Sequence, residues 1–180
     1  MNRIHRAIEF ATMKHRNQVR KGTDVPYIVH PMEVMQILTA EGCSEDVIIA
    51  GLLHDTVEDT ETTVEEIRER FGDRVAKLVA AESEDKSKTW EERKQHTLDY
   101  LTTCGEEEAI CCFADKISNM TSIAEDYERI GDKVWERFKR GKDQEAWYYR
   151  GIAEATKRFS DKELWKKYCD LVDEVFAGTK

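Results

Sequence analysis

The sequence contains, at residues 44–59, the stretch SEDVIIAGLLHDTVED, in which an apolar run leads directly into histidine and acidic side chains. Ser44 is a favourable N-cap residue, and the two acidic residues after it suit the positive end of a helix dipole. Residues 47–53 are apolar on nearly every side, which predicts a helix buried in the middle of the fold. This helix is expected to present His54 and Asp55 at its C-terminal end.

The rest of the chain also has the residue spacing of helices. Apolar side chains recur every three or four positions from Ile4 to Ala11, which predicts a first helix that ends near Gly22. Thr63, with Glu66 three residues later, forms a capping-box pattern that predicts the start of another helix. No segment has the alternation typical of a strand, so the predicted fold is all-α. Further helices are predicted at residues 32–40, 73–81, 90–103, 106–119, 121–130, 132–139, 143–159 and 161–177.

Bulk composition narrows the class of protein. With 28 basic and 37 acidic residues the formal net charge is −9, which argues against binding to nucleic-acid polymers or anionic membranes. No apolar run approaches the roughly 20 residues that span a bilayer, and the N-terminus lacks the pattern of a signal peptide. The five cysteines form no C-x-x-C pair and are typical of reduced thiols. We therefore expect one cytoplasmic domain, residues 1–180, whose partner is a small ligand.

Ionisable side chains at the end of an apolar helix need compensation. Burying His54 and Asp55 costs several kcal/mol unless they are paired or bind a metal. Helical spacing places Glu58 and Asp59 one turn later on neighbouring faces. Carboxylates this close to one another favour a bound cation or a raised pKa. The alternative is a solvated helix end on which acidic residues gather.

Two other ionisable residues, His30 and Asp115, also lie next to apolar segments. His30 directly precedes Pro31, which places it at a fixed junction between a loop and a helix, and a hydrogen-bonded core histidine is the alternative interpretation. Asp115 interrupts the apolar run AICCFADKI, and Lys116 points about 100° away from it on a helix. An Asp in such a run needs a partner. One shared cation would satisfy His30, His54, Asp55 and Asp115 together.

The chemistry of this residue set indicates a phosphohydrolase. Imidazole and carboxylate ligands together suit Mn²⁺, Fe²⁺ or Zn²⁺. Such an ion lowers the pKa of a water molecule and polarises a phosphoryl group. Glu58 and Asp59 are then the candidate acid/base or water-orienting residues.

The same motifs resemble, in their order, the HD phosphohydrolase superfamily. More narrowly, they are similar to the hydrolase domain of RelA/SpoT-type alarmone enzymes and to the small stand-alone alarmone hydrolases. The resemblance covers about residues 5–125 and leaves residues 126–180 as a C-terminal helical extension. It implies a single-domain helical bundle of the HD type. The segments that carry it are RKGTDVPYIVHP at 20–31, LLHDTVEDT at 52–60, FG at 71–72 and ADKISNM at 114–120.

The resemblance also implies an activity and a set of roles. The activity is Mn²⁺-dependent removal of the 3′-pyrophosphate from guanosine tetra- or pentaphosphate, with Fe²⁺ or Zn²⁺ as other candidate ions. The acidic pair Glu58 and Asp59 is implied to be catalytic. The implied metal ligands are His30, His54, Asp55 and Asp115, and the implied substrate contacts are Arg20, Lys21, Asn119 and Ser122.

Two alternatives remain open. The family often has Leu-His-Asn-Met-Arg after the final Asp and its basic neighbour, and here Ser118 and Thr121 replace the His and the Arg. This departure allows an HD phosphohydrolase that acts on another nucleotide or phosphoester. A non-catalytic nucleotide sensor is the third interpretation. It would require a degraded metal set or acidic pair, and every one of those residues is present.

Overall fold

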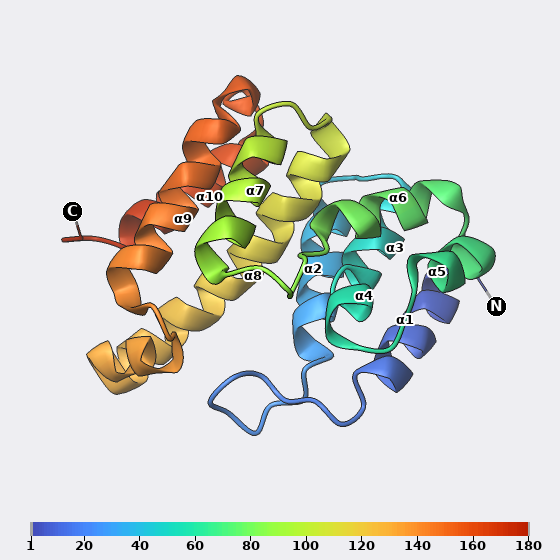
Figure 1. Ribbon diagram of the computed structural model, residues 1–180, viewed down its shortest axis with the longest axis horizontal. Coiled ribbons are helices and arrows are strands. Elements are labelled where there is room, and N and C mark those ends of the chain that lie inside the picture. Colours follow the sequence, from blue (N-terminus) through green and yellow to red (C-terminus); the bar gives the residue numbers. More distant parts are fainter. Residues whose placement is uncertain (1, 180) are drawn as a thin grey trace. The chain divides into compact units, whose positions relative to one another are not determined.

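The computed structural model describes residues 2–179, which form α-helices joined by turns and short 3-10 helices (Figure 1). The described residues contain no strand, and their β pairing is an isolated bridge between Val19 and Pro26. The all-α prediction is confirmed. None of the helices in this range combines the length and the apolarity needed to cross a membrane.

The chain divides into two compact units. The first comprises Met1–Glu84 and Ile110–Asp115, and the second comprises Asp85–Ala109 and Lys116–Lys180. The first contains α1 (Arg3–Lys14), α2 (Val29–Ala40), α3 (Glu45–Leu53), α4 (Thr56–Asp59), α5 (Val64–Phe71), α6 (Asp73–Glu82) and the middle of α8 (Glu106–Ile130). The second contains α7 (Trp90–Leu101), the two ends of α8, η1 (Gly131–Arg137), α9 (Gly141–Ala155), η2 (Lys157–Phe159) and α10 (Glu163–Val175). That residues 1–180 form one domain stays a prediction.

The central helix of the first unit is α3, as its apolar sequence predicts. It packs against α1, α2 and α6, and all its residues from Val47 to Leu53 are buried. Ser44 takes the N-cap position. Gly51 allows α3 to approach α2 closely, because a Cβ at this position would lie 2.3 Å from Cδ1 of Leu38. The close approach brings together the ends of two helices that carry histidines.

The first helix ends earlier than the sequence spacing predicts, so the prediction of an end near Gly22 was wrong. After α1 the backbone turns and pairs with the loop that leads to α2. The amide of Arg20 donates to the carbonyl of Val25 at 2.8 Å, and the amide of Tyr27 donates to the carbonyl of Gln18 at 2.9 Å. These bonds satisfy backbone groups that a longer helix would have used.

Two further boundary predictions were wrong. The long helix α8 continues through residue 120, where a break between two helices was expected, because Met120 is fully buried and no glycine interrupts the helix before Gly131. Residues 131–137 form the 3-10 helix η1 instead of the predicted α-helix. The predicted cap at Thr63 is confirmed, since its side chain accepts from the amide of Glu66 at 3.1 Å.

The second unit is organised around α9, which packs against α7, α10, η1 and η2. Aromatic side chains form part of this packing, and the rings of Tyr149 and Phe176 have centroids 5.3 Å apart. The hydroxyl of the fully buried Tyr168 donates to the carbonyl of Tyr149 at 2.7 Å. This bond ties α10 to α9.

The close approach of α2 and α3 can be tested by Gly51→Ala. The added Cβ would meet Leu38 at 2.3 Å and Val34 at 3.0 Å, both of them buried, so we expect the free energy of unfolding to fall by about 1–3 kcal/mol. Urea denaturation measures the loss. Leu38→Val shortens the clashing side chain, so the double variant should lose less than the sum of the two single losses. Additive losses would contradict the proposed clash.

Candidate metal centre

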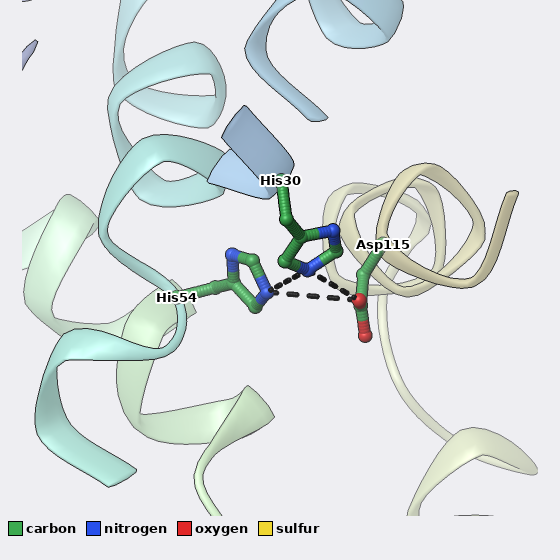
Figure 2. Close-up of side chains that lie close together, drawn as sticks. All are labelled: His30, His54 and Asp115. Atoms are coloured by element: carbon green, nitrogen blue, oxygen red, sulfur yellow. Dashed lines mark hydrogen bonds and ion pairs between the residues drawn. The ribbon is translucent and has the colours of Figure 1, made fainter. Parts of the chain in front are cut away.

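Three elements of the first unit bring one cluster of polar side chains together. His30 lies in the first turn of α2, His54 follows the last residue of α3, and Asp115 lies in the apolar part of α8 (Figure 2). One potential ligand atom from each lies within 4.8 Å of the other two. The three residues are only 1%, 4% and 6% exposed, respectively. They are therefore shielded from solvent inside an apolar unit.

The nitrogen atoms of the two imidazoles face each other and the carboxylate. The Nε2 atoms of His30 and His54 are 3.2 Å apart, and they lie 3.1 Å and 3.6 Å from Oδ1 of Asp115. Nδ1 of His54 lies 2.8 Å from the carbonyl oxygen of Gly51, to which it donates its proton. This bond fixes the ring so that, in the neutral form, the Nε2 lone pair faces the cluster.

Asp55 joins the cluster through a turn that interrupts the apolar stretch. Because α3 ends at Leu53 and α4 begins at Thr56, His54 and Asp55 lie between two helices. The Thr56 hydroxyl donates to the carbonyl of Leu53 at 2.6 Å and stabilises this turn. Oδ2 of Asp55 consequently lies 2.9 Å from Nε2 of His54 and 3.5 Å from Nε2 of His30.

The electrostatics of the cluster differ between the two histidines. Burial lowers the pKa of His30 and outweighs the nearby carboxylates. Burial also opposes the charged form of His54, but there Asp55 and Asp115 prevail and raise its pKa well above 6.5. Burial opposes the charged form of Asp55, yet the charge of His54 prevails and lowers the pKa of this carboxyl. The two carboxylates thus favour the charged form of His54, which lies beside Asp55.

This donor set fits a divalent metal ion. Two imidazole nitrogens and two carboxylate groups converge on one another, and such a mixed set suits Mn²⁺, Fe²⁺ or Zn²⁺. The charged form of His54, which Asp55 and Asp115 favour, compensates these carboxylates. A cation at this position would take over that compensation.

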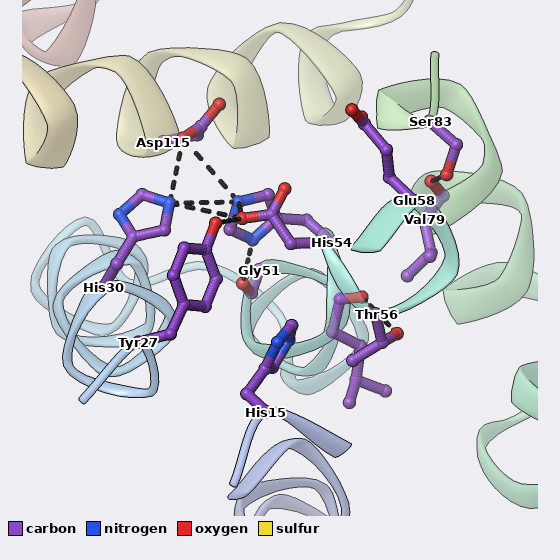
Figure 3. Close-up of polar contacts among 12 residues, drawn as sticks. His15, Tyr27, His30, Gly51, His54, Thr56, Glu58, Val79, Ser83 and Asp115 are labelled. Carbon is purple, nitrogen blue, oxygen red and sulfur yellow. Dashed lines mark hydrogen bonds and ion pairs between the residues drawn. The ribbon is translucent and has the colours of Figure 1, made fainter. Parts of the chain in front are cut away.

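The sequence prediction missed Tyr27. Its hydroxyl donates to Oδ2 of Asp55, within the group that contains His30 and His54 (Figure 3). Burial raises the pKa of Tyr27, and the charge of Asp55 raises it further, so the phenol remains a donor. The available signal was the position of this tyrosine between Pro26 and Pro31, in a loop whose conformation the prolines restrict.

The predicted acidic pair lies in α4, but its two carboxylates have different surroundings. Glu58, labelled in Figure 3, is half-buried, and its Oε2 accepts from the amide of Glu84 at 3.4 Å. Asp59 is exposed, and its backbone carbonyl accepts from Nε2 of Gln18 at 2.8 Å. Among the described residues, the converging cluster contains neither Glu58 nor Asp59.

The predicted substrate contacts are divided between the two units. Arg20 and Lys21 lie in the loop before α2, and the guanidinium of Arg20 is 5.8 Å from the ring centroid of Tyr27. Asn119 and Ser122 lie in the part of α8 that belongs to the second unit. Within the first unit the structure brings together the candidate metal ligands, and it places Arg20 and Lys21 in the loop before α2 of the same unit.

The fold and this cluster define the class of protein. Residues 7–105 match the HD domain family, and the chain belongs to this family. The matched range includes His30, His54 and Asp55, whereas Asp115 lies beyond its end.

Two relatives with similar sequences are named as 3′-pyrophosphohydrolases. Guanosine-3′,5′-bis(diphosphate) 3′-pyrophosphohydrolase of Aquifex aeolicus is 60% identical over 76 residues, which cover 42% of this chain and 11% of that protein. The MESH1 enzyme of Danio rerio, which has the same enzyme name, is 42% identical over 119 residues, which cover 64% of this chain and 66% of that protein. The chain thus spans less than two thirds of the length of each of these two relatives.

Solved structures show the same fold over more of the chain. One from Listeria monocytogenes EGD-e has a TM-score of 0.76 and 42% identity, and covers 84% of this chain and 96% of that one. The structure of a metazoan ortholog of SpoT, described as hydrolysing ppGpp, has a TM-score of 0.82 and 26% sequence identity. The match covers 97% of this chain and 96% of that one. The predicted helical fold of the HD type is confirmed.

The opposite pKa shifts of the two histidines predict how the stability of the metal-free protein depends on pH. The raised pKa of His54 gives a stabilisation that is complete below about pH 6.5 and is lost as pH rises through the folded-state pKa. The lowered pKa of His30 gives a stabilisation that is complete above about pH 6.5 and is lost as pH falls through its folded-state pKa. The free energy of unfolding should therefore be greatest near pH 6.5.

Urea denaturation in the presence of a chelator, between about pH 5.5 and pH 8, measures this dependence. Each histidine contributes a slope of at most about 1.4 kcal/mol per pH unit. The matched variant His54→Gln should lack the decline on the alkaline side. A native metal-free protein whose stability rises steadily up to pH 8 would contradict the charge state assigned to His54.

Proposed function

We propose that this chain hydrolyses the 3′-pyrophosphate of guanosine tetra- or pentaphosphate at a Mn²⁺ centre. The observation that carries the proposal is the convergence of His30, His54 and Asp115, together with Asp55, in a member of the HD domain family. Relatives named as 3′-pyrophosphohydrolases and a structural neighbour described as hydrolysing ppGpp support the choice of substrate. These four residues would hold the ion.

The protein side chains supply positioning and proton transfer. The ion, when bound, acts as a Lewis acid toward a phosphoryl group. Glu58, whose carboxylate is held by the amide of Glu84, takes a proton from the attacking water, and Asp59 orients that water. The bond between the ribose 3′ oxygen and phosphorus breaks, the water oxygen joins the released pyrophosphate, and a proton ends on the 3′ oxygen. Arg20 packs on the guanine base.

A second candidate is an HD phosphohydrolase that acts on another nucleotide. It is favoured by the buried Ser118 and the exposed Thr121, which stand where the resemblance leads one to expect a His and an Arg. Loss of those two side chains removes basic and hydrogen-bonding groups, which bears on specificity more than on the metal centre. The complete set of candidate ligands and acidic residues argues against a non-catalytic sensor.

The five cysteines of the sequence form no C-x-x-C pair. This pattern is typical of reduced thiols, which persist in reducing compartments, and it supports the cytoplasm as the place where the protein acts. A small phosphorylated nucleotide is the partner that the proposed reaction requires.

The direct test is metal analysis of the native protein followed by an assay of pyrophosphate release. We expect the Mn²⁺-loaded protein to release pyrophosphate from ppGpp and to lose this activity on chelation. A panel of other phosphorylated nucleotides, assayed side by side, distinguishes the two candidate functions. Cleavage of another nucleotide without cleavage of ppGpp would overturn the proposed substrate and support the second candidate function.

Two variants separate metal binding from proton transfer. Asp55→Ala should lose both the metal and the activity, because it removes a charged ligand. Glu58→Gln should keep the metal and lower kcat by about 100-fold or more, because it removes an acid/base group. Glu65→Gln, an exposed position on α5, is the matched control and should behave like the native protein. Equal metal loss in Asp55→Ala and Glu58→Gln would make Glu58 a ligand and overturn the assigned roles.

A further inference from the structure

We infer that Tyr27 is a positioning residue of the metal centre, whose hydroxyl holds the Asp55 carboxylate in the orientation that directs it to His54 and His30. The inference rests on the proposed metal centre. It assigns a role to a side chain that is not itself among the candidate ligands.

The backbone of Tyr27 is fixed on both sides. Its amide donates to the carbonyl of Gln18 at 2.9 Å, and its own carbonyl accepts from the amide of His30 at 3.0 Å. Pro26, directly before it, restricts the loop further and takes part in the bridge with Val19. The position from which the phenol extends is therefore set by local structure.

The ring of Tyr27 lies between two imidazoles. Its centroid is 4.9 Å from that of His15 and 5.8 Å from that of His30. His15 is buried at the end of α1, and its Nδ1 lies 2.6 Å from Oε1 of Gln18. Contacts on two sides limit rotation of the phenol ring, so the hydroxyl has a defined position relative to Asp55.

The hydroxyl of Tyr27 contacts the same carboxylate oxygen of Asp55 that faces the two histidines. It donates to Oδ2 of Asp55, the atom that lies 2.9 Å from Nε2 of His54 and 3.5 Å from Nε2 of His30 (Figure 3). Asp55 lies in the turn between α3 and α4, so its carboxylate is presented from a turn rather than from the middle of a helix. A donor outside the ligand set that orients a ligating carboxylate typically contributes 10- to 100-fold to metal affinity.

The test is a titration of the metal-free Tyr27→Phe variant with Mn²⁺, in which the electron paramagnetic resonance signal measures the free Mn²⁺. This variant keeps the ring and its contacts with the two histidines and removes the hydroxyl alone. We expect the Kd for Mn²⁺ to rise by about 10- to 100-fold. Tyr168→Phe is the matched control, because it also removes the hydroxyl of a buried tyrosine. That hydroxyl donates a hydrogen bond to the carbonyl of Tyr149. Tyr168→Phe should lower the free energy of unfolding and leave the Kd for Mn²⁺ unchanged.

A double-mutant cycle shows whether Tyr27 acts through Asp55. In an Asp55→Glu background, which keeps a carboxylate for Mn²⁺ but moves it relative to the hydroxyl of Tyr27, Tyr27→Phe should change the Kd for Mn²⁺ much less than it does in the native protein. An unchanged Kd in Tyr27→Phe alone, or an equal effect in both backgrounds, overturns the positioning role. A native protein that binds no Mn²⁺ overturns the proposed metal centre and this inference with it. Native Mn²⁺ binding with an unaffected Tyr27→Phe variant overturns the inference alone.

Discussion

The first unit depends on the compensation of ionisable groups that its core buries. His30, His54 and Asp115 are almost completely shielded, and each would destabilise an apolar interior by several kcal/mol if it stood alone. The fold can bury them because the Nε2 atoms of the two histidines and Oδ1 of Asp115 lie 3.1–3.6 Å from one another, so that the side chains compensate one another's polar groups. The close approach of α2 and α3 and the apolar surroundings of Asp115 in α8 are thus parts of one arrangement.

Each local feature of the sequence contributes a separate constraint to that arrangement. Pro31 places His30 in the first turn of α2, and the hydroxyl of Thr56 closes the turn that follows α3. The carbonyl of Gly51 then sets the orientation of the His54 ring. These short-range constraints orient His30, His54 and Asp55 locally, and the packing of α2 against α3 then brings the histidines together.

Short-range determination also explains which features the sequence predicts. The buried character of α3 and the all-α fold follow from apolar periodicity, and the need to compensate Asp115 follows from its apolar neighbours. The end of α1 was mispredicted because Gln18 and Arg20 pair with a loop several residues later, a contact that periodicity does not contain. The partnership of Tyr27 with Asp55 was missed for the same reason, since it joins residues from two different segments.

Metal chemistry and substrate choice place different demands on this chain. A metal centre needs a few donors at fixed short distances, and the first unit contains all four candidates. Recognition of a nucleotide needs further contacts, which are spread over a base, a ribose and several phosphates. Replacements such as those at Ser118 and Thr121 can therefore alter specificity while leaving His30, His54, Asp55 and Asp115 intact. Membership of the HD domain family accordingly constrains the reaction class more tightly than it constrains the nucleotide.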